Sequence, residues 1–175
     1  MRGETGPRGT AGHAGPRGST GSTGPQGPAG STVAAHCGMF NNGCGEVNIA
    51  PDEVAAMTFS DFMPAVGARY DEHHSAVITD AGTYTIDFCL RAKSLSDGSV
   101  QIALTNDGMI MQSSVVNADF NHDQPLNVTG FAMAEFAQGA HLHFIVYSKE
   151  GARFRLNDGV NLSMRATKIG PITTK

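Results

Sequence analysis

The sequence predicts an all-β globular head preceded by a triple-helical stalk, and three observations lead to this fold class. Glycine occupies every third position from Gly3 to Gly30. Beyond this segment, apolar and polar residues alternate along several short stretches separated by turn residues. Long stretches with the 3.6-residue period of an amphipathic helix do not occur. We therefore divide the chain into a stalk, residues 1–32, and a head, residues 33–175.

The glycine register defines the stalk. Three polyproline-II-like chains wind around a common axis only if every third residue lacks a side chain, because the axis has no room for a Cβ. A flexible Gly/Ser linker shares the composition but not the period. The segment therefore predicts a collagen triple helix, which requires three chains. The glycines in register are Gly3, Gly6, Gly9, Gly12, Gly15, Gly18, Gly21, Gly24, Gly27 and Gly30.

Proline in the stalk occupies only the first position after glycine, so the second position offers no proline for hydroxylation. This pattern is similar to that of bacterial and phage collagens, in which arginine and threonine take the second position. Threonines there point outward, which makes them candidate O-glycan acceptors, although plain solvated hydroxyls explain them equally well. The candidates are Thr5, Thr20, Thr23 and Thr32.

The head is predicted from its two-residue period. Tyr84, Ile86, Phe88 and Leu90 share one face of a strand over 83–91, and residues 100–104 alternate in the same way. Asp107-Gly108 then favours a tight hairpin turn into a strand over 109–116. Many short strands with turn signals between them predict a β-sandwich or jelly roll. Further strands are predicted at 75–79, 126–136, 141–148, 152–156 and 160–168.

Four segments of the head carry a resemblance: "DAGTYTIDFCLRA", the "TNDG" turn, the "FAQGAHLHFIVYS" strand pair and the closing "GVNLSMRATKIG". With a collagen stalk in front, they resemble the complement and tumour-necrosis-factor-like jelly-roll superfamily, and more closely the heads of collagen-like exosporium glycoproteins of spore-forming bacteria. Gly139-Ala140 stands where the superfamily often has Gly-Asp, and residues 161–165 lack the Phe-x-Gly pattern of the animal heads. The resemblance implies a compact homotrimer whose heads share a threefold axis and nucleate the stalk.

Motifs for catalysis are absent from the sequence. It has no Gly-x-Ser-x-Gly elbow, no His-Glu-x-x-His pair, no phosphate-binding glycine loop and no Cys-x-x-Cys. We therefore expect no enzyme, no catalytic residues and no cofactor. A formal net charge of −4 argues against a nucleic-acid partner, and no apolar run approaches the length of a membrane span.

The three cysteines leave two arrangements open. Cys37 and Cys44 flank "GMFNNG", so they are candidates for an intrachain loop disulfide, while their position beside the stalk also suits links between chains. Cys89 lies in a predicted strand, where we expect a small buried apolar residue. In a reducing compartment all three would be thiols.

Two histidines alternate with apolar residues in the predicted strand 141–148. His141, His143, Ile145 and Tyr147 share one face, and if this face lies on the implied threefold axis, three copies of each meet there. We take these four residues as trimer-axis candidates. Convergent imidazoles could hold a metal, but hydrogen-bonded interface histidines are the commoner case, so we expect no metal site.

The sequence thus predicts a structural, non-enzymatic surface protein. Ten triplets without hydroxyproline form a weak triple helix, because aligning three chains costs conformational entropy, and a trimeric head supplies that alignment. We expect an extracellular, hair-like layer of glycoprotein that serves adhesion or shielding on a bacterial spore or cell. The alternative is the receptor-binding tip of a collagen-containing phage tail fibre on the virion. In both settings a host-surface carbohydrate or protein is the candidate ligand.

Overall fold

The computed structural model describes residues 1–15, 17–18, 34–157 and 159–172, and the chain separates into two units, Met1–Gly30 and Ser31–Lys175. Within the first unit, every described residue is exposed and none lies in a helix or strand. A Cβ added at any glycine from Gly3 to Gly18 would meet no atom within 4 Å. The triple helix, which needs two further chains, stays a prediction. Thr5 is exposed, and the other candidate glycan sites, Thr20, Thr23 and Thr32, lie outside the described residues.

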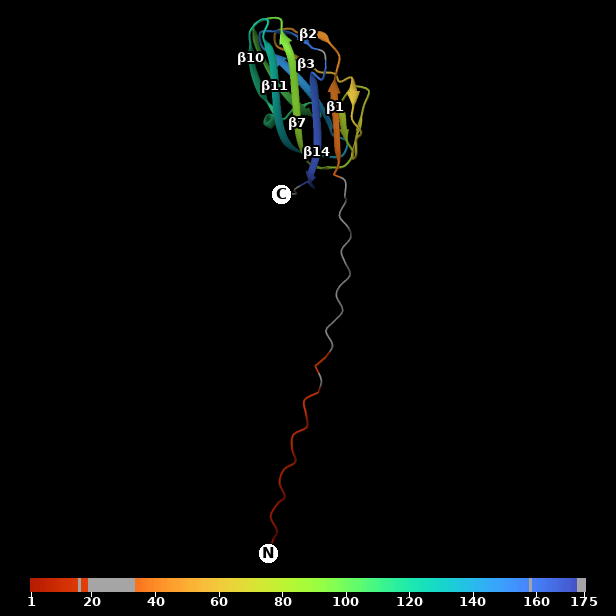
Figure 1. Ribbon diagram of the computed structural model, residues 1–175, viewed down its shortest axis with the longest axis vertical. Helices are drawn as coiled ribbons and strands as arrows, with labels where there is room; N and C mark the ends of the chain where they lie inside the picture. Colours follow the sequence, from red (N-terminus) through yellow and green to blue (C-terminus); the bar gives the residue numbers. More distant parts are fainter. Residues whose placement is uncertain (16, 19–33, 158, 173–175) are drawn as a thin grey trace. The chain divides into compact units, whose positions relative to one another are not determined.

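The second unit, the head, consists of two antiparallel sheets. Sheet A has the order β2-β13-β7-β14-β1-β4, and β11 pairs along the free side of β7. In Figure 1, β1, β14, β7 and β11 lie side by side across one face of the head. The strands of sheet A are β1 (His36–Asn41), β2 (Gly45–Ile49), β4 (Asp61–Phe62), β7 (Gly82–Ser94), β11 (Pro125–Phe136), β13 (Ala152–Leu156) and β14 (Leu162–Gly170).

Sheet B has the order β10-β8-β12-β6-β5, with β3 also pairing to β12 and β9 to β8. A single 3₁₀ turn, Gln112–Ser114, is the one helical element among the described residues. The strands of sheet B are β3 (Glu53–Ala56), β5 (Ala68–Tyr70), β6 (Ala76–Ile78), β8 (Gly98–Asn106), β9 (Met109–Ile110), β10 (Val116–Phe120) and β12 (His141–Ser148).

The core lies between the two sheets and follows from strand alternation. Along β7, the residues with even numbers from Tyr84 to Leu90 are buried, and the intervening residues point away from the core. The ring of Phe88 in sheet A meets that of Phe144 in sheet B edge to face, with centroids 5.6 Å apart. Phe59 packs on the same Phe144 ring at 6.4 Å. These aromatic contacts join the two sheets into one sandwich.

The hairpin predicted at Asp107-Gly108 is confirmed. Asn106 pairs with Met109, and the two residues between them have φ values of 49° and 79°, as a two-residue turn of the primed type requires. Strands β12 and β13 have their predicted bounds, and β11 begins one residue early.

The strand predicted over 109–116 is wrong. After the short β9, the buried hydroxyl of Ser114 accepts the Leu104 N–H at 2.8 Å and donates to the Met111 carbonyl at 2.7 Å. These bonds hold the chain in the 3₁₀ turn, and pairing with β8 resumes only at β10.

Candidate functional site: the outward face of sheet A

The strand register of sheet A brings together residues that are far apart in the sequence. On the side of the sheet away from the core, one row across four strands consists of Phe40, Ser163, Cys89 and Thr129. The three residues on β14, β7 and β11 have small side chains, so this row forms a shallow floor. Cross-strand neighbours of this kind cannot be read from local spacing, because each comes from a different strand.

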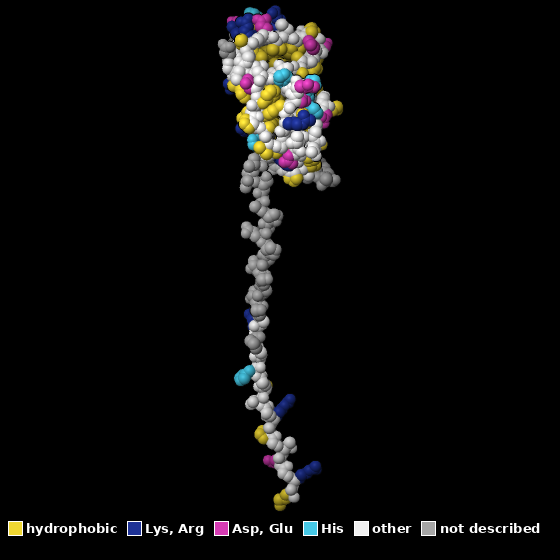
Figure 2. All heavy atoms as spheres, turned by 90° about the vertical axis from the view of Figure 1, so that its right-hand side faces the viewer, with side chains coloured by type: hydrophobic (Ala, Val, Ile, Leu, Met, Phe, Trp, Pro, Cys, Tyr) yellow, Lys and Arg dark blue, Asp and Glu magenta, His cyan; other side chains and the backbone are white. Residues whose placement is uncertain are grey.

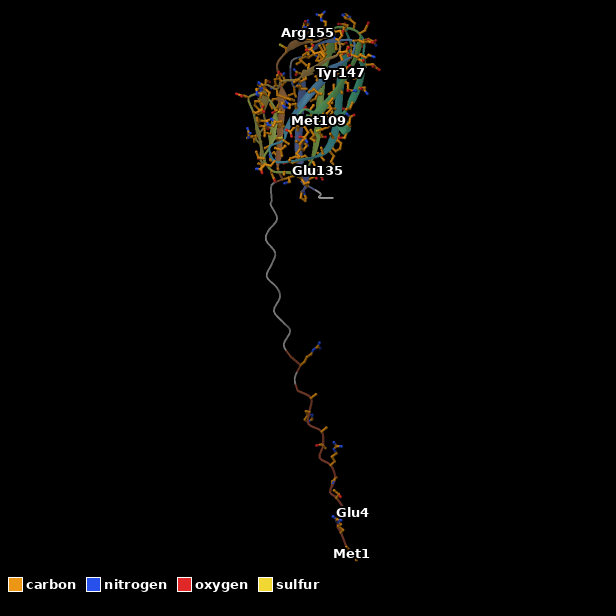
Figure 3. The ribbon with its side chains drawn as sticks, turned by 180° about the vertical axis from the view of Figure 1, so that it is seen from behind. Met1, Glu4, Met109, Glu135, Tyr147 and Arg155 are labelled. Atoms are coloured by element: carbon orange, nitrogen blue, oxygen red, sulfur yellow. The ribbon has the colours of Figure 1, made fainter. Side chains whose placement is uncertain are left out.

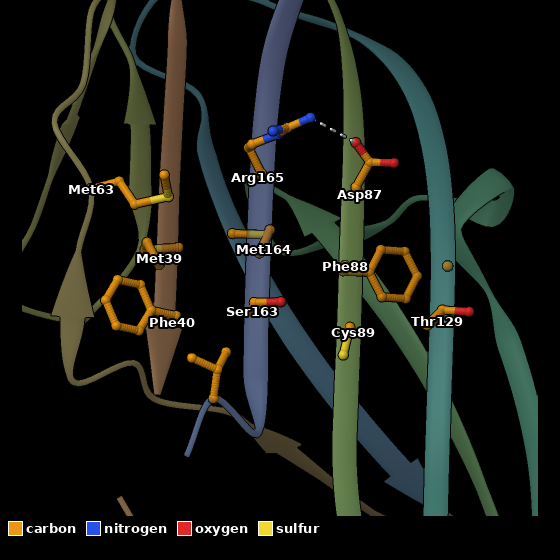
Figure 4. A pocket seen from close by; sticks show the side chains of 12 residues that line it. Met39, Phe40, Met63, Asp87, Phe88, Cys89, Thr129, Ser163, Met164 and Arg165 are labelled. Atoms are coloured by element: carbon orange, nitrogen blue, oxygen red, sulfur yellow. Dashed lines mark ion pairs between the residues drawn. The ribbon is translucent and has the colours of Figure 1, made fainter. Parts of the chain in front are cut away.

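The next row carries larger side chains. Arg165 on β14 lies opposite Asp87 on β7, and their nearest charged atoms are 3.9 Å apart. Phe131 on β11 continues the row, and at its other end Met63 extends over Gly38, where a Cβ would come within 2.6 Å of the Met63 sulfur. Figure 4 shows the ion pair with Met63 on one side. Large side chains therefore border the small floor.

The floor and its border form a groove of about 560 Å³. Two large apolar side chains that line it are exposed, Met63 to 45% and Val160 to 48%, and two more are exposed further along β11, Met133 to 51% and Phe131 to 55%. We call these four residues, together with Phe40, the sheet A face. Seen from the side of the head on which β1 lies, hydrophobic side chains gather in patches among polar ones (Figure 2). Several large apolar side chains exposed on one face of a sheet are typical of a protein interaction site.

The structure separates the three cysteines, and all of them are free thiols. Cys37 is buried in β1, and burial raises its pKa to about 11. Cys44 is exposed, beyond the end of the extended strand β1, so the two candidate disulfide partners are not joined. The expectation that Cys89 is buried is wrong, because it lies on the outward side of β7 and lines the groove while partly exposed.

The structure places the predicted trimer-axis residues on the outward face of sheet B. The core-facing residues of β12 are Leu142, Phe144 and Val146, and the four candidates point the other way. His141 Nδ1 lies 3.1 Å from Asp71 Oδ2, and its ring stacks on that of His143 with centroids 6.3 Å apart. Ile145 is only 8% exposed within a single chain. The four residues therefore share a face, as predicted, and their place on an axis stays a prediction.

Desolvation is the main cause that lowers the pKa of His143 below its ordinary value, with His141 and His73 acting in the same direction. Burial also acts on Asp71, where it raises the pKa. Hydrogen bonds from Ser75, His73 and His141 nevertheless hold that pKa at about 2. The His141 ring thus lies beside a carboxylate that stays charged at every pH at which histidine titrates.

Within the part of the chain that the structure describes, no group of three or more His, Cys, Asp or Glu side chains is arranged to hold a metal ion. Among the same residues, no helix is long and apolar enough to cross a membrane.

No protein-family model matches the chain, and no curated protein matches it by sequence. A solved structure does match: Eiger TNF from S. frugiperda, with a TM-score of 0.54, 13% sequence identity, and coverage of 81% of this chain and 95% of that chain. The head has a TNF-like jelly-roll fold. This finding confirms the jelly-roll part of the sequence resemblance. At 13% sequence identity, the similarity shows the fold of the head but gives no information about its ligands.

Proposed function

We propose that this chain is a structural, non-enzymatic surface protein whose head trimerises through the sheet A face and thereby aligns three collagen-like chains. One observation carries the proposal: a chain whose stalk has the glycine period of a triple helix has, on its head, a sheet with large apolar side chains exposed to water. Two further copies of the same head are the natural cover for such a face, because the glycine period calls for three chains. The TNF-like fold is commonly trimeric, which supports this assembly.

Covering Phe131 and its neighbours would contribute much of the free energy of trimerisation. A phenylalanine side chain buries roughly 200 Å², and Phe131 is 55% exposed in the single chain. At about 25 cal/mol per Å², covering the exposed part would contribute about 2–3 kcal/mol per subunit. Met133, Met63 and Val160 add to this gain. On sheet B, by contrast, Ile145 is already buried within one chain, so covering the outward face of β12 gains little from it.

Trimerisation of the head would explain why the glycine period ends where the head begins. Aligning three stalk chains costs conformational entropy, and joining each to a trimeric head raises their effective concentration. Within the head, the first residues of β1 pair with the last residues of β14, since His36 lies opposite Thr167. Both ends of the head domain therefore lie at the same end of sheet A, in the sheet that we propose as the interface.

The setting that we propose is the surface of a bacterial spore or cell, where stalks and heads together form a hair-like layer for adhesion or shielding. The support is the collagen pattern with arginine and threonine in place of hydroxyproline. The second candidate is the receptor-binding tip of a collagen-containing phage tail fibre. A polar pocket on sheet B favours a receptor-binding role for the head in either setting.

The test of the assembly is a matched pair of charge substitutions. Phe131 on sheet A and Val54 on sheet B are equally exposed, at 55% and 54%. We expect light scattering to give three times 18.3 kDa for the unmodified chain and for Val54→Lys. Phe131→Lys should instead dissociate at micromolar concentration, because a buried ammonium opposes the interface. A monomeric unmodified chain, or dissociation by Val54→Lys alone, would contradict the proposal.

A further inference from the structure

A second hollow lies on sheet B, on the opposite side of the sandwich from the sheet A face. It has a volume of about 260 Å³. Figure 3 views the head from behind and labels Tyr147 in this part of the sheet. We call this hollow the sheet B pocket. Beside Val100, the residues that line it are Ser99, Gln101, Asn117, Asp119, Tyr147 and Lys149.

The pocket is built on three neighbouring strands. Gln101 on β8 lies opposite Asn117 on β10 and opposite Tyr147 on β12, so a carboxamide, a second carboxamide and an aromatic ring form one row. In the next row, Ser99 lies opposite Asp119, and Lys149 directly follows the end of β12. Both rows stand on regular strands of the sheet, which holds their spacing constant.

The hydrogen bonds within the pocket leave polar groups for a ligand. Gln101 Nε2 donates to Asn117 Oδ1 at 3.1 Å, so the Gln101 carbonyl oxygen and the Asn117 amino group are not used by this bond. The Tyr147 hydroxyl donates to Asp52 Oδ1 at 2.9 Å, which anchors the ring at its far end. The anchored ring presents an apolar face beside unused amide donors and acceptors.

Charge in the pocket is balanced. Asp119 lies opposite Ser99 on β10, and Lys149 follows the end of β12, which pairs with β8 on its other side. Within the described part of the chain, neither of them is in an ion pair. One carboxylate and one ammonium, unpaired and separated, accept and donate hydrogen bonds without selecting for a charged ligand.

We propose that the sheet B pocket binds a neutral hexopyranose unit of a glycan. A sugar ring has an apolar C–H face that packs on an aromatic side chain, and its edge carries hydroxyl groups that both donate and accept. The pocket offers Tyr147 for the face, and Asn117, Gln101 and Asp119 for the hydroxyls. Its volume suits one or two sugar rings. An acidic sugar has no advantage over a neutral one, because the charges of Asp119 and Lys149 balance.

Glycan binding by the pocket would serve the adhesive role proposed above. Its biological use rests on that role, but the binding itself does not. The sheet A face and the sheet B pocket lie on opposite sides of the sandwich, so the pocket stays open in the proposed trimer. Three pockets on one stalk would add avidity to weak single sites.

The experiment is saturation-transfer difference NMR on the full chain with methyl glucoside, methyl galactoside and methyl mannoside as separate probes. Glucuronate serves as the acidic probe. We expect at least one neutral glycoside to bind with a Kd of about 1 mM. Tyr147→Ala and Asn117→Ala should each weaken binding by about fivefold or more, because each removes one contact worth about 1 kcal/mol. Tyr147→Phe keeps the ring and should bind nearly as the unmodified chain does.

Val54→Thr is the matched control, because Val54 lies opposite Tyr147 on β3 but outside the pocket, and it should bind normally. No signal from any neutral glycoside at tens of millimolar would overturn the inference, as would binding of glucuronate alone or binding that survives Tyr147→Ala and Asn117→Ala. Light scattering on the same samples reports the trimer separately. A trimer without a sugar signal therefore counts against the pocket alone.

Discussion

The ring of Phe88 on β7 lies over Gly130 on the neighbouring strand β11, so closely that a Cβ at position 130 would overlap the ring. Gly130 faces the core between Val128 and Ala132, which are both buried. The missing side chain at this position therefore makes room for the ring that also meets Phe144 of sheet B.

Gly130→Val should destabilise the head by about 1–3 kcal/mol, because the added side chain overpacks the core and forces the Phe88 ring out of its place. The measurement is the free energy of unfolding in denaturant. Gly45→Ala is the control: Gly45 lies in β2 with no atom near its Cβ position, so the change should be neutral or slightly stabilising. Equal effects of the two substitutions would contradict the packing argument.

The stalk should depend on the head, and not the reverse. We expect residues 33–175 alone to form a folded trimer. Residues 1–32 alone should be unfolded at room temperature, because a stalk of so few triplets has nothing to nucleate its triple helix. Circular dichroism of the stalk peptide measures its triple-helix content, and light scattering measures the mass of the isolated head. Gly15→Asp in the full chain should disrupt the triple helix locally and leave the head trimer intact. A stalk peptide that forms a stable triple helix by itself would contradict this dependence.

Thiol labelling should report which face is covered in the trimer. Cys44 is exposed and should react rapidly with a maleimide, while Cys37 is buried with a pKa of about 11 and should stay unreactive in the folded head. Cys89 lines the groove of the sheet A face, so we expect it to be protected in the trimer and to become reactive in Phe131→Lys. Mass spectrometry of each labelled peptide measures this. Rapid labelling of Cys89 in an intact trimer would exclude the sheet A face as the interface.

Acid should destabilise the head through His143. Its pKa in the folded chain lies below the ordinary value of 6.5, chiefly because of desolvation, so the unfolded state binds more protons than the folded state near that pH. His143 therefore does not oppose folding above about pH 6.5, and it lowers the free energy of unfolding as the pH falls through that value. We expect a lower melting temperature at about pH 5 than at about pH 7.5, and we expect His143→Gln to remove much of the difference.

The same titration tests the two candidate faces. Asp71 stays charged throughout this range because its pKa is about 2, and His141, His73 and Asp107 are the other groups that act on His143. If the trimer forms through the sheet A face, its mass should stay constant while the head loses stability. Dissociation of the folded trimer at about pH 5, relieved by His143→Gln, would instead place β12 at the threefold axis.

Local patterns in the sequence were sufficient for part of the fold. A period of two predicts β7, β8, β11 and β12, and Asp107-Gly108 predicts the β8–β9 hairpin, as the structure confirms; the period of three in the stalk stays a prediction. Each of these signals is contained in a few consecutive residues. The strands between residues 36 and 70 were missed, because they are short and several of them alternate weakly, so their pairing with distant partners decides that they are strands.

The two candidate sites depended on tertiary structure. Cys89 and Phe131 belong to one apolar face only because β7 pairs with β11, and Tyr147 joins Gln101 and Asn117 only because β12, β8 and β10 are neighbours in sheet B. The sequence by itself predicts three chains, from the glycine spacing, and an all-β head, from strand alternation, because both are local properties of the chain; the structure confirms the all-β head. Which apolar groups share one face of the sandwich was decided by strand order and register, because these join residues that local spacing leaves unrelated.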